Sequence, residues 1–212
     1  MSKRPDLSVV WAPWQDSMPV EEPATAVVDW LKNNAFGWGN RLTVVADVNA
    51  ASAEPSVEEF STNGNILTHK NRRRVERGGP VLAYQPGDQE LELAVQPSVG
   101  NYLGIVEFHH PTIDGFVAAT RALNVLTGEP DPGVSEEIDK LFVKLDSVGY
   151  NGFSKRDSFV MRQAPPIIRD LLSEGFDADF IVTYALASGT TFRHAKQLRE
   201  LLPKELDGDL YS

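Results

Sequence analysis

Four side chains that could take part in catalysis or ligand binding lie in one short stretch of the chain: Glu107, His109, His110 and Asp114. Proteins use carboxylates and imidazoles for general acid-base chemistry and for binding metal ions. Adjacent residues of a strand point to opposite faces, so His109 and His110 converge on one ligand only if the chain turns between them. Pro111 favours such a turn because proline cannot continue a strand ladder. In the alternative interpretation, one histidine packs or caps at this position while the other faces solvent.

The sequence on either side predicts where these groups lie. Residues 103–108 form a short apolar run that is typical of a strand covered on both faces. In residues 116–126 the apolar side chains recur at spacings of three and four, which predicts a helix. The polar residues between the two elements therefore project from the carboxyl end of a strand, where open α/β sheets bind their ligands. A second predicted strand, residues 41–47, ends in Asp47 and brings that carboxylate to the same edge.

Further predicted strands at residues 7–11 and 81–85 alternate with helices or loops, a pattern typical of a parallel sheet. We therefore expect the α/β class, with a small parallel sheet of about four strands flanked by helices over residues 1–128. Beyond residue 133 the sequence predicts helices only, so residues 134–203 form a helical segment that packs on the sheet or makes a small second domain. The apolar positions Ile138, Leu141, Phe142 and Leu145 predict that the helix over residues 135–148 buries this face.

A basic run over residues 70–77 contrasts with the net charge of -10 of the 212-residue chain. It includes Arg72, Arg73 and Arg74, and guanidinium groups bind phosphates and carboxylates through a planar fork. This run is the best candidate for binding an anion. The alternative is a solvated face that interacts with the protein's own surplus of acids.

The C-terminal sequence has the pattern of a helix-turn-helix, with Gly189 at the turn. Its second helix carries Arg193, His194, Lys196 and Arg199, which could contact DNA. The acidic balance of the chain argues against duplex binding, and glycine turns are common in helical hairpins that only pack.

Composition excludes several classes of function. The chain has no cysteine, so disulfides, thiolate metal sites and a cysteine nucleophile are absent. Neither a dinucleotide-binding glycine fingerprint nor a P-loop is present, and we expect no cofactor. We also expect no structural metal, because only four histidines are available as imidazole ligands. No uncharged apolar stretch approaches the length of a membrane span and no signal peptide is evident, which predicts a cytoplasmic protein without membrane contact.

The leading functional prediction is a cytoplasmic binding or regulatory module. It recognises an anionic small molecule or a protein partner at the carboxyl edge of the sheet. The expected site combines Asp47, Glu107, His109 and His110 with positive charge from Arg72, Arg73 and Arg74. Two alternatives stay open: a hydrolytic enzyme that uses His109 or His110 as general base, and a nucleic-acid-binding protein that uses the C-terminal helices.

Overall fold

A parallel sheet forms the centre of the molecule. The computed structural model of the chain describes residues 5–19, 21–71, 78–108 and 113–203. In these residues six strands pair in parallel in the order β3-β2-β4-β5-β1-β6. The strands are β1 (Ser8–Ala12), β2 (Leu42–Val44), β3 (Asn65–Leu67), β4 (Val81–Tyr84), β5 (Tyr102–Val106) and β6 (Leu123–Asn124). The predicted α/β class is confirmed, and the sheet has six strands where about four were expected.

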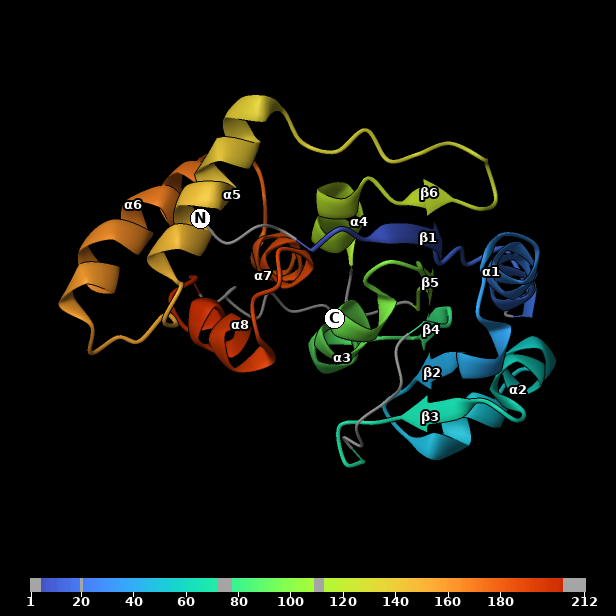
Figure 1. Cartoon of the computed structure of the whole chain (residues 1–212). Coiled ribbons are helices and arrows are strands. Elements are labelled where there is room, and N and C mark those ends of the chain that lie inside the picture. The colour runs from blue at the N-terminus through green and yellow to red at the C-terminus, as the bar shows by residue number, and fades with distance from the viewer. Residues whose placement is uncertain (1–4, 20, 72–77, 109–112, 204–212) are drawn as a thin grey trace, which may run out of the picture.

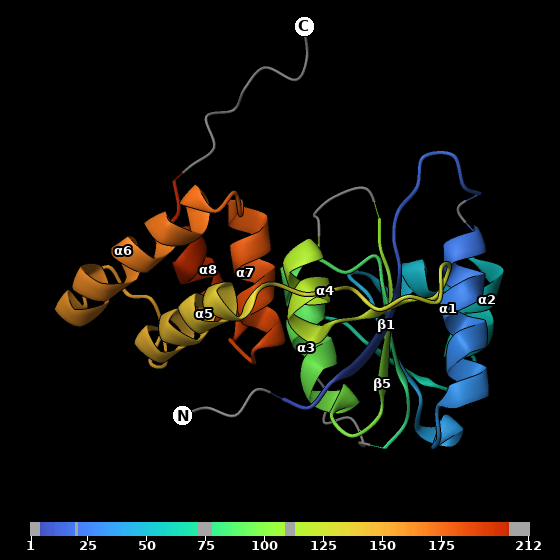
Figure 2. The same cartoon turned by 90° about the horizontal axis from the view of Figure 1, so that it is seen from above.

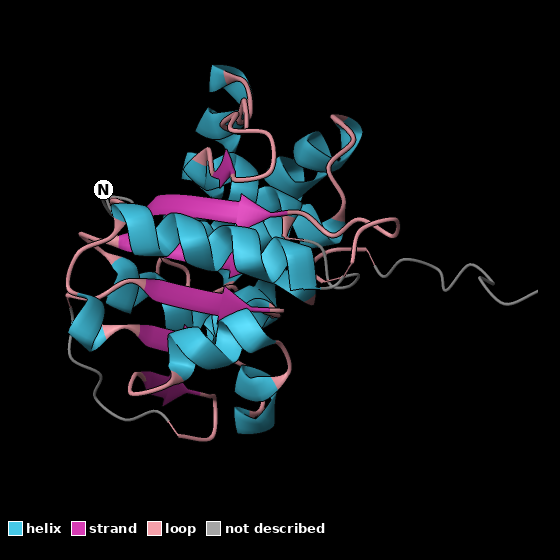
Figure 3. Ribbon diagram, turned by 90° about the vertical axis from the view of Figure 1, so that its right-hand side faces the viewer, coloured by secondary structure: helices cyan, strands magenta, loops and turns pink. Residues whose placement is uncertain are grey.

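Helices cover both faces of the sheet. The described residues form α1 (Glu21–Asn34), α2 (Pro55–Ser61), α3 (Asp88–Ser98), α4 (Asp114–Thr120), α5 (Glu136–Val148), α6 (Ser158–Ser173), α7 (Ala178–Ala187) and α8 (Phe192–Arg199), with short 3-10 helices η1 (Trp38–Asn40) and η2 (Val48–Ser52). Helices α1 and α2 lie on one face, and α3 and α4 lie on the other (Figures 1 and 2). Helices α5 to α8 form a further layer outside α3 and α4, on the side away from the sheet (Figure 2). Figure 3 looks onto the face that α1 and α2 cover.

The buried apolar side chains form two clusters, one on each face of the sheet. Val27 of α1 and Leu82 of β4 belong to the cluster beneath α1 and α2. The other cluster runs from Ile105 of β5 through Phe116 of α4 to Leu198 of α8. The C-terminal helices therefore share a continuous apolar core with the sheet. The division into domains at residues 1–128 and 134–203 stays a prediction.

A glycine lets α4 approach α7 closely. A Cβ atom at Gly115 would overlap the carbonyl oxygen of Phe180 and lie 2.7 Å from Oγ1 of Thr183. Glycine permits such backbone approach because it has no side chain. Helix α7 is thus held against the layer that covers the sheet, and seven of its residues are buried.

The prediction of one helix over residues 116–126 was wrong in its second half. Helix α4 ends at Thr120, because Arg121 adopts a left-handed conformation with φ 50°. Leu123 then pairs with Val10 in strand β6, at the edge of the sheet. Leu126 packs against the apolar cluster on the opposite face from α4. The apolar residues therefore keep a helical spacing even though the chain changes from a helix to a strand after Thr120.

The predicted helix at residues 135–148 is confirmed as α5. Its N-cap, Ser135, accepts a hydrogen bond from the Ile138 amide at 3.3 Å, which satisfies one of the free donors of the first turn. Ile138, Phe142 and Leu145 are buried as expected. Leu141 is only half-buried, so the predicted buried face is wrong at this position.

Helix α6 contains two prolines, Pro165 and Pro166, in its interior. It starts at Ser158 because Asp157 caps it, accepting hydrogen bonds from the Phe159 amide at 2.8 Å and the Val160 amide at 3.3 Å. None of the described helices combines the length and the apolar character needed to span a bilayer.

Candidate functional site

The carboxyl edge of the sheet has a division between β2 and β4. After β2 the chain continues into η2 and α2 on the α1 face, whereas after β4 it continues into α3 on the opposite face (Figure 2). Adjacent parallel strands whose connections leave on opposite faces open a crevice at their carboxyl ends, where ligands of open α/β sheets bind. We define the edge site as the carboxyl ends of β2, β3 and β4 together with the described residues that directly follow these strands.

Asp47 lies at this edge, as predicted. It is exposed and precedes η2, where its carboxylate accepts a hydrogen bond from the Asn49 amide at 3.0 Å. One of its roles is therefore to fix the local turn. A capping carboxylate keeps free lone pairs that can still meet a ligand or solvent.

The basic run begins at the same edge, in the turn that follows β3. Oγ1 of Thr68 accepts hydrogen bonds from the amides of Lys70 and Asn71, each at 3.2 Å, which holds the turn in place. Lys70 is exposed and forms no ion pair within the described part of the chain. Arg72, Arg73 and Arg74, the predicted anion-binding residues, lie outside the described residues.

His69 connects this turn to α3. Its Nδ1 lies 3.8 Å from Oε1 of Glu90, a buried residue in the first turn of α3. The other oxygen of Glu90 accepts a hydrogen bond from the Gly87 amide at 3.2 Å. Because β2 lies between β3 and β4, this contact extends across the carboxyl end of β2. The contact between His69 and Glu90 therefore forms one side of the edge site.

Gln85, directly after Tyr84 at the end of β4, has an unusual backbone conformation. Gln85 has φ 51°, in the left-handed region that a residue with a side chain adopts at a cost of roughly 1–2 kcal/mol. Its amide Nε2 donates a hydrogen bond to the Tyr84 hydroxyl at 3.0 Å. Burial, together with the nearby charge of Glu54, raises the pKa of Tyr84 to about 12, so the hydroxyl is neutral at physiological pH. Strained residues of this kind are concentrated at binding and catalytic sites.

Glu107 lies further along the same edge, at the end of β5. Its two carboxylate oxygens accept hydrogen bonds from the amides of Trp14, at 3.3 Å, and Ile113, at 3.5 Å. Burial raises the pKa of Glu107, the Trp14 amide opposes the shift, and the charge of Asp114 adds to it. Glu107 thus joins the loop after β1 to the residue that precedes α4. This arrangement indicates a positioning role.

An aromatic pair lies beside Glu107. Phe108 is 40% exposed, and its ring lies edge-on to Trp14 with the ring centroids 4.8 Å apart. The neighbouring His109 and His110 lie outside the described residues. Their predicted role as ligand-binding groups or as general base stays a prediction.

The structure places Asp47 and Glu107 on one edge but at different strands. Strand β4 separates β2 from β5, which makes the two strands about 10 Å apart at the usual strand spacing. Each carboxylate is bound by its own loop amides. Among the described residues no group of three or more acidic or histidine side chains is arranged to hold a metal ion.

Sequence reasoning missed the Tyr84–Gln85 pair and the contact between His69 and Glu90. Gln85 follows a predicted strand just as Asp47 does, so the same rule that selected Asp47 could have selected Gln85. Its left-handed backbone carries no signal in the sequence, because glutamine is not a typical residue for that conformation. The contact between His69 and Glu90 depends on the order of the strands, which the sequence does not state.

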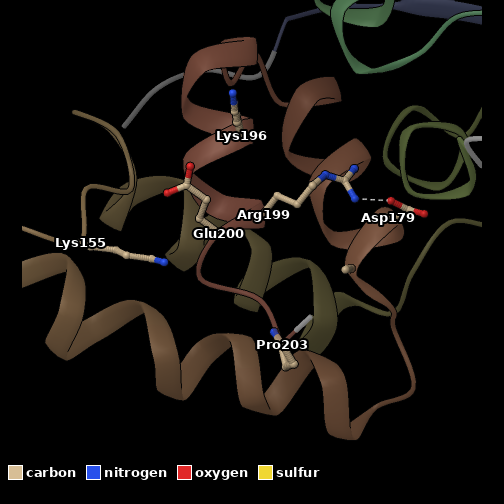
Figure 4. A pocket seen from close by; sticks show the side chains of 7 residues that line it. Lys155, Asp179, Lys196, Arg199, Glu200 and Pro203 are labelled. Atoms are coloured by element: carbon tan, nitrogen blue, oxygen red, sulfur yellow. Dashed lines mark hydrogen bonds and ion pairs between the residues drawn. The ribbon is translucent and has the colours of Figure 1, made fainter. Parts of the chain in front are cut away.

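The C-terminal hairpin surrounds a separate cavity of about 560 Å³, which is shown in Figure 4. Lys155, Lys196 and Arg199 contribute positive charge to its lining, and Asp179 and Glu200 contribute negative charge. Arg199 points to Asp179 and also donates to Asp88 of α3 at 3.0 Å (Figure 4). One of the four predicted DNA-contacting residues is therefore engaged within the protein.

Comparison with models of protein families, with curated proteins and with solved structures finds no match to this chain.

Proposed function

We propose that this protein is a binding or regulatory module that recognises an anionic small molecule or a protein partner at the carboxyl edge of its sheet. The edge site is the place of recognition. The observation that carries the proposal is Gln85, which holds a strained backbone conformation beside a buried tyrosine hydroxyl at the end of β4. Strain of this kind persists where the surrounding structure enforces it, and binding sites are a frequent reason for it.

Charge favours an anionic small molecule over a protein partner. The edge site has carboxylates at Asp47 and Glu90, so an anion needs a strong source of positive charge. The basic run supplies it, because Lys70 stands at the edge without an ion-pair partner in the described residues and Arg72, Arg73 and Arg74 follow within four positions. The Gln85 amide adds a hydrogen-bond donor that can contact an anionic oxygen. In this proposal the protein acts in the cytoplasm.

Isothermal titration calorimetry with pyrophosphate and with adenosine monophosphate tests the proposal. Replacement of Arg72, Arg73 and Arg74 by alanine should weaken binding at least about ten-fold, because each charge-assisted hydrogen bond contributes roughly 1.5–3 kcal/mol. The matched control replaces three exposed arginines of the helical segment, Arg156, Arg162 and Arg169, by alanine and changes the net charge equally. Equal losses in the two triple variants, or unchanged binding in the first, would contradict the proposal.

A single substitution tests the contribution of Gln85. Gln85→Asn keeps an amide and suits the left-handed backbone, but it shortens the side chain by one methylene. We expect weaker anion binding with little loss of stability, because asparagine tolerates this conformation better than glutamine. Unchanged affinity in a folded variant would remove Gln85 from the site.

A hydrolytic enzyme is the alternative that one observation favours. Glu107 is half-buried with a raised pKa and lies two residues before His109, which matches a carboxylate beside a general base. Hydrolysis of p-nitrophenyl esters or phosphates that is lost in the His109→Ala or the His110→Ala variant, and kept in His194→Ala, would support this alternative over the binding module.

A further inference from the structure

A second cavity lies between the sheet layer and the C-terminal helices. Its volume is about 520 Å³, within the range of pockets that hold small molecules. Four segments line it: the carboxyl half of β1, the first two turns of α4, the connection that leads into α5, and the turn between α6 and α7. We call it the α4–α7 cavity.

Aromatic side chains contribute to the apolar lining of this cavity. Trp11, Phe176 and Phe180 line it, and each is half-buried. The rings of Phe176 and Phe180 lie 4.5 Å apart between centroids, and Phe142 packs against both at 6.1 and 6.2 Å. Interlocked rings of this kind form a rigid wall whose faces carry partial negative charge.

Carboxylates supply the only formal charge among the described residues that line the cavity. They are Asp114 at the start of α4, Asp131 in the connection, and Glu174 after α6. Asp131 is held in place because its Oδ1 accepts a hydrogen bond from the Gly133 amide at 2.7 Å. Asp114 has no ion-pair partner within the described part of the chain. All the charged side chains that line the cavity are therefore negative. Arg121 lies behind Gly133, where its Nε is 3.2 Å from the position a Cβ would take, and it is not part of the lining.

The pKa of Asp114 reflects these negative charges. Partial burial raises it, and the charges of Asp177 and Asp131 raise it further. Like charges that face one another across a cavity disfavour ionisation, and a bound cation reverses that effect. A positively charged ligand relieves this repulsion between the carboxylates.

We propose that the α4–α7 cavity binds an organic cation, an ammonium group carried on a small apolar body. Aromatic faces and carboxylates together are the combination that recognises such cations, and quaternary ammonium groups are the best-known example. A metal ion fits the site less well, since the acidic side chains of the described residues do not come together as a chelating group. Their spread around a wide cavity suits a large, diffuse cation.

Cation binding at the α4–α7 cavity is independent of anion binding at the edge site. The two sites share no lining residue, and they select ligands of opposite charge. Loss of anion binding at the edge site would leave cation binding at the α4–α7 cavity intact, so the failure of either proposal can be recognised by itself.

Choline and its neutral isostere 3,3-dimethylbutan-1-ol form a matched pair of probes, because they differ in charge and hardly in shape. We expect isothermal titration calorimetry to show choline binding at least about ten-fold more tightly than the alcohol, the order of magnitude for a desolvated cation on aromatic faces. The double variant Asp114→Asn/Asp131→Asn should lose most of this preference. Phe180→Leu should weaken choline binding several-fold, while circular dichroism verifies that the variant is folded.

The control double variant Glu58→Gln/Glu129→Gln removes two exposed carboxylates outside the cavity and changes the net charge equally. It should bind choline like the wild type. Choline affinity should also fall as the pH is lowered through the raised pKa of Asp114, because the protonated carboxyl no longer attracts the cation. Equal binding of the two probes, equal losses in the two double variants, or displacement of choline by one equivalent of Ca²⁺ would each overturn the proposal.

Discussion

The guanidinium of Arg199, at the end of α8, donates a hydrogen bond to the carboxylate of Asp88, at the start of α3, over 3.0 Å. The two residues are 111 positions apart in the chain. Arg199 also donates to Asp179 near the start of α7. One arginine thus joins three helices, because its planar fork can bind two carboxylates at once.

Replacement of Arg199 by methionine should lower the free energy of unfolding by about 1–3 kcal/mol. Asp88, with only 17% of its side chain exposed, would lose its cation, which is the costly part of the change. Solvent screens the pair in part, since the Arg199 side chain is 38% exposed, so the loss should stay below that of a fully buried pair. Urea denaturation measures the effect. Lys140→Met, which breaks the exposed pair between Lys140 and Glu136, should cost less than about 0.5 kcal/mol, and equal costs would contradict the prediction.

Truncation of Leu145 should destabilise the protein far more than truncation of Leu141. Leu145 is 1% exposed, and replacing such a residue with alanine leaves a cavity that costs roughly 2–5 kcal/mol. Leu141 is half-buried on the same helix, so we expect Leu141→Ala to cost about 1–2 kcal/mol. Thermal and urea denaturation of both variants provide the comparison. The reverse order would show that α5 is rotated about its axis.

Glu107 should make stability depend on pH in a characteristic direction. Its pKa is raised in the folded protein, so between the ordinary carboxyl pKa and the raised value the folded state binds more protons than the unfolded state. Stability attributable to Glu107 is therefore present at low pH and is lost as the pH rises through this interval. The Glu107→Gln variant should lack this loss, so the difference in unfolding free energy between it and the wild type should change across the interval. A constant difference across the interval would argue against the shift.

A methyl group at position 115 should disrupt the contact between α4 and α7. We expect Gly115→Ala to destabilise the protein by about 1–3 kcal/mol, because the new Cβ overlaps the Phe180 backbone and the helices must move apart. The control is Gly39→Ala, where a Cβ meets no heavy atom within 4 Å. There the change should stay within about 0.5 kcal/mol or be slightly stabilising. Similar losses in the two variants would mean that the helices adjust freely.

The fold class could be predicted because apolar runs separated by helical patterns require a parallel sheet. The number of strands could not, since β3 has three residues and β6 has two, too few to show a pattern of their own. Leu123 and Leu126 were assigned to a helix because their spacing fits one. The structure instead ends that helix at Arg121, whose left-handed backbone is not a conformation that arginine favours.

The sequence predicts the edge of the sheet at which the candidate site lies, but not which side chains come together there. Carboxyl ends of parallel strands share one edge, which places Asp47 and Glu107 there without knowledge of the strand order. The distance between them depends on β4 lying between their strands, and this order is a long-range property of the fold. For the same reason the sequence did not reveal the α4–α7 cavity, whose walls come from four separate segments.

The two-residue length of β6 and the three-residue length of β3 have a consequence for how this protein meets other molecules. These are the outermost strands of the described sheet, and they expose very few free backbone groups along its margins. Long, flat margins invite another chain to add a strand, which is a common origin of self-association and amyloid growth. The sheet of this protein is therefore a poor template for the addition of a strand from another chain.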